Sequence, residues 1–90
     1  MKAIFNEKEL EIINADNSAS FNDEKVTMRL SISLLDTSLS VDDIISLNLN
    51  TSLIVIKDED QEFSFKDYKI DSIRKSFGNN RLTIELIKNR

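Results

Sequence analysis

The chain contains no histidine, cysteine, tryptophan or proline, and its one glycine is Gly78. Without His or Cys it lacks the commonest general base, the thiol nucleophile and the ligands that hold most zinc ions. With one glycine it cannot build a Gly-rich phosphate-binding loop. The absence of cysteine also excludes disulfides, so apolar packing or association with partners must stabilise the fold. We therefore expect a protein that is not an enzyme and that carries no metal or other cofactor.

The size and composition are those of one folded domain. No linker, repeat or low-complexity tract divides residues 1–90, and this length is typical of a single domain. Hydrophobic residues make up 40% and charged residues 31%, which is typical of a globular chain rather than a disordered one. No apolar run approaches the ~18 residues of a membrane span, and residues 1–9 have no apolar stretch of the signal-peptide kind. We expect a cytoplasmic location and no membrane association.

The clearest positive signal is the alternation of polar and apolar residues from Lys25 to Leu34. The apolar positions on one side are Val26, Met28, Leu30, Ile32 and Leu34. A period of two residues is typical of a strand that lies half on a core and half in water. This segment is therefore predicted to be a strand with one buried face.

Shorter strands are predicted on both sides of this segment. The candidates are Lys2–Phe5, Leu10–Ile13, Leu53–Ile56, two segments between Phe63 and Phe77, and Leu82–Leu86. Leu53–Ile56 is apolar on both faces, which favours an interior strand. The apolar residues change parity twice between Phe63 and Phe77, which indicates β-bulges or sharp bends that curl a sheet.

Polar and small residues predict the connections. Asp58–Gln61 is predicted to be a turn, and Ser76–Arg81 carries the strongest hairpin signal because Gly and Asn tolerate positive φ. Asn14–Asn22 is rich in Asn, Asp and Ser and is also read as a turn, although Ala19 and Phe21 could extend a strand through part of it.

One short helical segment is predicted between Ser38 and Ser46. Ser40 and Asp43 have the spacing of a capping box, and Val41 and Ile44 have helical spacing. Residues 45–49 also alternate, so a helical turn followed by a strand to Leu49 is expected. Together these elements predict an all-β fold, a small antiparallel barrel or sandwich of six or seven short strands with one short helical segment.

Two clusters of acidic residues could suggest metal binding or catalysis, but a structural role is favoured for each. Asp58, Asp60 and Glu62 alternate, but a calcium loop needs more oxygen ligands and a glycine at its sharp turn, so a solvated hairpin turn is favoured. Asp42 and Asp43 lie at the predicted helix start, where acidic residues interact favourably with the helix dipole.

Aromatic and basic residues lie close together between Phe63 and Lys75. Aromatic side chains beside cations can stack single-stranded bases, and Phe63, Phe65 and Tyr68 have such neighbours. The net charge of the chain is −4, however, whereas a nucleic-acid-binding surface is basic. Two Phe residues at i and i+2 of a strand are therefore predicted to be core, and nucleic acid is not expected as a partner.

Charge is distributed unevenly along the chain. Residues 1–60 hold 5 Lys/Arg and 12 Asp/Glu, a net charge of −7, whereas residues 61–90 hold 7 and 4, a net charge of +3. The charges could intermix across paired strands. They could instead orient self-association or docking on a protein partner through a strand edge. The candidate interaction surface comprises Ile54, Ile56, Lys66, Lys69, Arg74 and Lys75.

Three segments of the C-terminal half show a resemblance to known proteins. They are Asp43–Ile45, Phe63–Ile73 and Asn80–Leu86, and their hydrophobic pattern resembles that of the small β-barrel domains of bacteriophage tail and baseplate proteins. The resemblance implies a structural subunit of a virion, in the tail or at the head–tail junction.

The function expected from these observations is non-catalytic: a structural, assembly or protein-interaction module, located in the cytoplasm or in a virion and forming an oligomer or a complex. The alternative is a small inhibitor, encoded by a phage or mobile element, that binds a host enzyme or a nucleotide messenger. An acidic face that imitates nucleic acid would suit the second role.

Overall fold

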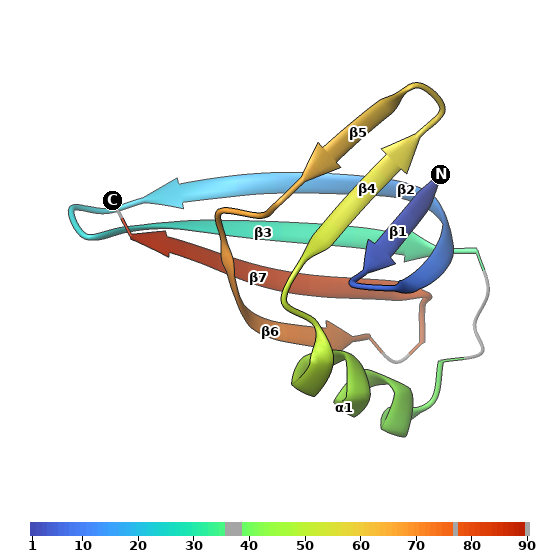
Figure 1. Ribbon diagram of the computed structural model, residues 1–90. Coiled ribbons are helices and arrows are strands. Elements are labelled where there is room, and N and C mark those ends of the chain that lie inside the picture. Colours follow the sequence, from blue (N-terminus) through green and yellow to red (C-terminus); the bar gives the residue numbers. More distant parts are fainter. Residues whose placement is uncertain (36–38, 77, 90) are drawn as a thin grey trace.

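A computed structural model of the protein describes residues 1–35, 39–76 and 78–89. Within these ranges the chain forms seven strands and one helix (Figure 1). In chain order they are β1 (Lys2–Phe5), β2 (Lys8–Phe21), β3 (Lys25–Leu34), α1 (Val41–Asn50), β4 (Ile54–Asp58), β5 (Gln61–Ser64), β6 (Lys69–Lys75) and β7 (Arg81–Asn89). All strand pairs are antiparallel, so the predicted fold class is confirmed.

The seven strands form one curled sheet in the order β5-β4-β1-β2-β3-β7-β6. Strands β5 and β6 stand at opposite ends of this order, yet only residues 65–68 connect them. In a flat sheet six strand spacings of ~4.8 Å would separate them by about 29 Å. The connection can span at most about 18 Å, so the sheet must bend until its two ends approach each other. The described strands leave it open, because β5 and β6 do not pair.

Two β-bulges accompany this curvature. The β2–β3 register shifts between Ile12 and Asn14, and the β6–β7 register shifts between Ile70 and Ser72. The second bulge is one of the two parity changes that the sequence predicted. The other coincides with the connection at residues 65–68, and Phe77 lies outside the described residues.

The core lies on the concave side of the sheet. The predicted strand Lys25–Leu34 is confirmed with the same bounds as β3, and Leu30, Ile32 and Leu34 are buried. Val26 and Met28 are only half-buried, because β2, β3 and β7 extend together beyond the core as an arm (Figure 1). We use this name, the arm, for the part that projects from the core: residues 18–28 of the β2–β3 hairpin, together with residues 87–89 of β7, which pair with residues 25–27.

The predicted turn over Asn14–Asn22 is wrong. This segment continues β2 as far as Phe21, and the turn is confined to residues 22–24. There the Asn22 side-chain oxygen accepts the N–H groups of Glu24 and Lys25, at 2.9 and 2.8 Å. Pairing with β3 overrides the turn preference of Asn, Asp and Ser, because strand propensity depends strongly on the partner strand.

The predicted capping box is confirmed, but the strand predicted after it is wrong. The Ser40 hydroxyl accepts the Asp43 N–H at 3.2 Å, and the Asp43 carboxylate accepts the Ser40 N–H at 2.8 Å. The helix then continues to Asn50 instead of ending near Ile44. Ile44 and Leu47 have helical spacing and pack on the core, which favours helix over the alternation also present in this segment.

Candidate functional site

The structure separates the residues of the predicted interaction surface. Ile54 and Ile56 are 0% and 4% exposed, so they form no exposed apolar surface of the kind predicted, and Ile56 is reached only from the cleft described below. The reason is that β4 lies between β1 and β5 and turns both side chains into the concave core. The basic members lie elsewhere: Lys66 in the connection after β5, and Lys69, Arg74 and Lys75 on β6.

Two of these basic residues already have partners on neighbouring elements. The Arg74 guanidinium is 3.1 Å from the Glu85 carboxylate, which also contacts Arg29 at 2.9 Å. The Lys75 ammonium donates to the Leu39 carbonyl at 3.3 Å. Arg29 belongs to the acidic part of the chain and Glu85 to the basic part, so charges from the two parts do intermix on this face.

The two Phe residues predicted as core have different environments. Phe65 is buried and meets the Tyr68 ring edge-on, with 6.4 Å between ring centroids. Phe63 is 54% exposed on β5, so its assignment to the core is wrong. It lies opposite Ile56 in the β4–β5 register and therefore on the concave face of the sheet. Its exposure means that the core is open beside β5.

The outer part of β2 has a neighbour on one side only. Residues 8–11 pair with β1, and Ile12–Phe21 pair with β3 on the other side. Among the described strands, none pairs with the second edge of Asn14–Phe21. The open edge follows the part of β2 that pairs with β1: the Ile12 N–H donates to the Met1 carbonyl at 3.0 Å, and a register shift between Ile12 and Asn14 comes next.

Backbone groups of every second residue point out of this edge. In an antiparallel ladder, successive residues turn their N–H and C=O groups alternately to the two sides. Asn22 donates its N–H to the Lys25 carbonyl at 3.1 Å, so even-numbered residues of this segment face β3. The residues whose backbone faces outward are Ala15, Asn17, Ala19 and Phe21. Ala15 and Asn17 lie opposite Ile32 and Leu30, so side chains of this parity are on the concave face.

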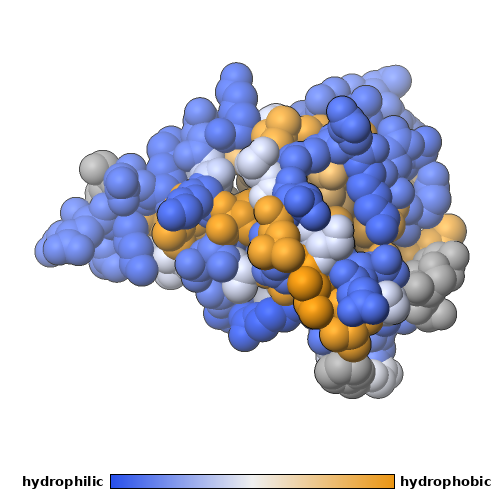
Figure 2. All heavy atoms as spheres, turned by 60° about the horizontal axis from the view of Figure 1, so that its bottom comes forward, coloured by the Kyte–Doolittle hydropathy of each residue, from blue (hydrophilic) through white to orange (hydrophobic). Residues whose placement is uncertain are grey.

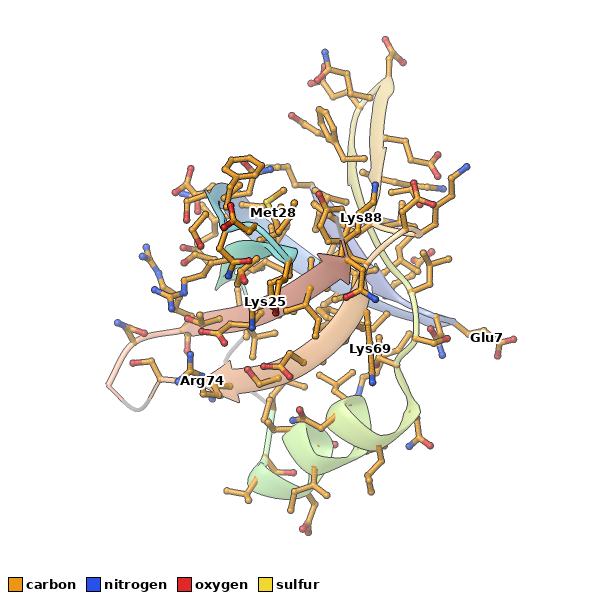
Figure 3. The ribbon with its side chains drawn as sticks, turned by 90° about the vertical axis from the view of Figure 1, so that its left-hand side faces the viewer. Glu7, Lys25, Met28, Lys69, Arg74 and Lys88 are labelled. Carbon is orange, nitrogen blue, oxygen red and sulfur yellow. The ribbon has the colours of Figure 1, made fainter. Side chains whose placement is uncertain are left out.

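A cleft of about 300 Å³ lies beside this edge, between β2 and the β4–β5 hairpin. Its lining residues are Met1, Ala15, Asp16, Asn17, Leu30, Ile56, Asp58, Phe63 and Phe65. Leu30, Ile56 and Phe65 are buried and give the cleft an apolar floor. Viewed along the arm, the hairpin stands away from the long strands, and Met28 and Lys88 lie on the side of the arm that faces it (Figure 3). We call the outer edge of Asn14–Phe21 together with this cleft the open-edge site.

Acidic residues lie beside the open-edge site, mainly at the β4–β5 hairpin. Asp16 and Asp58 line the cleft, and Glu59, Asp60 and Glu62 follow on the β4–β5 hairpin. Glu59 takes a left-handed φ of 51° in the turn between β4 and β5, where the sequence predicted a turn. In the described part of the chain, no group of three or more carboxylates lies close enough together to hold a metal ion.

Strand β6 also has an outer edge, but α1 covers it. The Asn48 side-chain oxygen accepts the Ile73 N–H at 2.9 Å, and its amide donates to the Ile73 carbonyl at 2.8 Å. One side chain thus makes the pair of hydrogen bonds that a neighbouring strand would make. Asn6, with a positive φ of 58°, holds the other end of the helix by accepting the N–H groups of Ser52 and Leu53.

The outward side of α1 is apolar as well. Val41, Ile45 and Leu49 are spaced four residues apart and are 61%, 50% and 78% exposed. Figure 2 shows hydrophobic residues gathered in a band on the face that bears this helix. Among the described helical residues, no segment is long and apolar enough to span a membrane.

Comparison with protein-family models, with curated proteins and with solved structures finds no match for this chain. Function is therefore inferred from the geometry of the chain itself. Sequence reasoning missed the open-edge site because it read Asn14–Asn22 as a turn. The signal that could have found it is weak: the apolar residues Ala15, Ala19 and Phe21 share one parity, although polar Asn17 stands between them.

Proposed function

We propose that the protein is a non-catalytic interaction module that binds an extended segment of a partner protein by strand addition to β2. The observation that carries this proposal is the unpaired edge of Asn14–Phe21 beside an apolar cleft. In strand addition, main-chain hydrogen bonds supply affinity and side-chain pockets supply specificity. The open-edge site offers both.

The guest strand would lie beside β2 in line with β1, on the same edge of β2. Strand β1 pairs with residues 8–11 of β2, and next to this pairing the Ile12 N–H donates to the Met1 carbonyl. A guest in line with it would meet the outward backbone groups of Ala15, Asn17, Ala19 and Phe21. Alternate guest side chains would enter the cleft, because successive side chains of a strand point to opposite faces.

Apart from the bulge between Ile12 and Asn14 at its start, the edge lacks the usual protection against strand pairing. Natural proteins protect exposed edges with Lys, Pro, bulges or covering elements. Residues 14–21 contain no Lys or Pro, and their one charged side chain is Asp16. The β6 edge of the same protein is covered by Asn48. An edge left open for eight residues beside an open cleft is thus best explained by a partner that completes it.

Hydrogen exchange of individual amides tests the proposal. We would mix the isotope-labelled chain with seven-residue peptides that alternate valine with lysine, serine or glutamate. Binding of any of them should slow exchange at Ala15, Asn17, Ala19 and Phe21. It should leave Ser18 and Ser20 unchanged, since their N–H groups already face β3. Protection without this alternation, or no protection by any peptide, would refute strand addition.

Two variants of Ala19 test the role of its outward N–H group: one removes this donor and the other keeps it. Ala19→Pro deletes the outward N–H and should abolish peptide protection, because proline is tolerated where its missing N–H faces away from the sheet. Ala19→Thr keeps the N–H and suits a strand, so it should bind as the wild type does. Circular dichroism of both variants shows whether the fold is retained.

A further inference from the structure

We infer that the segment accepted by the open-edge site is basic and alternates lysine or arginine with aliphatic residues. This inference rests on the strand addition proposed above and names the chemistry of the guest. Two independent properties of the site support it, the apolar floor of the cleft and the acidic residues beside it.

The cleft determines one set of guest side chains. Its floor consists of Leu30, Ile56 and Phe65, and Phe63 forms an exposed aromatic wall. At about 300 Å³ it has room for one or two aliphatic side chains of the size of valine or leucine. Guest residues of the parity that faces this floor would lose apolar surface to it, which favours burial without any specific bond.

The charges determine the other set. Asp58 lines the cleft, and its side chain has the parity of Ile56 and therefore lies on the concave face. Glu59 and Asp60 follow it in the turn of the β4–β5 hairpin, and Asp16 borders the cleft from β2. Glu62 does not add to this charge, because it lies opposite Lys57 on the other face of the hairpin. A basic guest would approach in a favourable field, whereas an acidic guest would be repelled.

The same charges argue against a second copy of this chain as the guest. Pairing two β2 edges would bring together two Asp16 side chains and two acidic β4–β5 hairpins, on molecules that each carry a net charge of −4. The basic residues of the chain lie mainly in residues 61–90, which include β6 and β7, and both strands are already paired in the sheet. The guest is therefore a segment of a different protein.

Three labelled peptides test the inference by fluorescence anisotropy. The first is Lys-Val-Lys-Val-Lys-Val-Lys, the second has glutamate in place of each lysine, and the third has four lysines followed by three valines. The first should bind about tenfold more tightly than the second at low salt, the combined effect of a few exposed charge pairs. The difference should shrink as the Debye length falls from ~10 Å at 0.1 M to ~3 Å at 1 M.

A matched pair of variants locates the effect. Asp58→Asn removes a carboxylate that lines the cleft, and it should weaken binding of the first peptide several-fold. Glu7→Gln removes the same charge in the β1–β2 turn, where Figure 3 shows Glu7 pointing away from the sheet, and it should leave binding unchanged. Equal effects of the two variants would mean that net charge alone attracts the peptide, and this would overturn the inference.

The remaining outcomes separate this inference from the proposed function. If the glutamate peptide binds as tightly as the lysine peptide, and each protects the alternate amides of β2, strand addition stands and the basic guest is wrong. If the block peptide binds as tightly as the alternating one, the cleft selects no side chains and the inference fails.

A wild-type dimer in light scattering that Ala19→Pro converts to a monomer would identify a second copy as the guest. If none of the peptides protects the β2 amides, both proposals fail.

Discussion

Strand β6 and the outer part of β2 each pair with a neighbour on one side, and the chain treats these two edges differently. At β6, α1 lies against the strand, and the Asn48 amide bonds both backbone groups of Ile73. At β2, no described strand pairs with the edge of residues 14–21, and a cleft opens beside it. Strand β5 is also an edge, but it is four residues long and carries Glu62. The comparison shows that this protein can cover an edge, and that it leaves its longest one accessible.

The two edges also differ in what lies beneath them. Ile73 on β6 is 3% exposed and belongs to the core, whereas Phe21 on β2 is 68% exposed at the end of the arm. The covered edge is thus part of the stable interior, and the open edge projects from it. Local opening is expected to be easier in the arm, where fewer apolar contacts must break.

The largest expected effect tests this difference in stability. Ile73→Ala should lower the free energy of unfolding by about 2–5 kcal/mol, because it removes buried methyl and methylene groups and leaves a cavity. Phe21→Ala deletes a larger side chain but should stay within about 0.5 kcal/mol, since most of that side chain is already in water. Urea melts of both variants measure the two values. Similar losses would show that the arm is as tightly packed as the core and would break the comparison.

The sequence predicted those features that depend on local patterns. The alternation of Lys25–Leu34 predicted β3 with its observed bounds, and the Ser40–Asp43 spacing predicted the helix start. Both are short-range signals, in which the interacting groups lie within a few residues of one another. The bulge near Asp71 also left a local trace as a change of parity.

The sequence could not predict the features that depend on distant partners. Residues 14–21 have turn-forming side chains, and only pairing with β3 makes them a strand. The role of Asn48 depends on Ile73, 25 residues further along the chain. The open edge depends on register, because it exists only where β1 ends while β2 continues. These are tertiary relations, and the shared parity of Ala15, Ala19 and Phe21 is the one weak local trace of them.

A smaller effect is expected from removing the cover of β6. Asn48→Ala leaves the Ile73 N–H and carbonyl without their side-chain partner, at a cost of about 1–3 kcal/mol. Asn50→Ala is the matched control, because its amide bonds only Ser46 within the helix. Urea melts and light scattering at rising concentration compare them. We expect Asn48→Ala alone to form larger species, since it exposes a strand edge. If the Asn48→Ala protein were as stable and as monomeric as the Asn50→Ala protein, Asn48 would neither stabilise β6 nor prevent association at its edge.

The smallest expected effect is a pH dependence of helix α1, which lies against the β6 edge. Hydrogen bonds from the Ser40 backbone and side chain lower the pKa of Asp43 below its ordinary value of 3.8. Because the folded-state pKa is lowered, this stabilisation is fully present above the ordinary value and is lost as pH falls through the folded-state value. Asp43→Asn should therefore flatten the fall in melting temperature as pH drops below 3.8. Asp42→Asn is the control, because it changes the same charge one residue away and keeps the capping box. The β2 edge has no such capping box beside it, so exchange at Ala15 and Ala19, corrected for its intrinsic pH dependence, should not change with the Asp43 substitution. If the melting temperatures of the two Asn variants depended on pH in the same way, the capping box would not be the source of the pH dependence of α1.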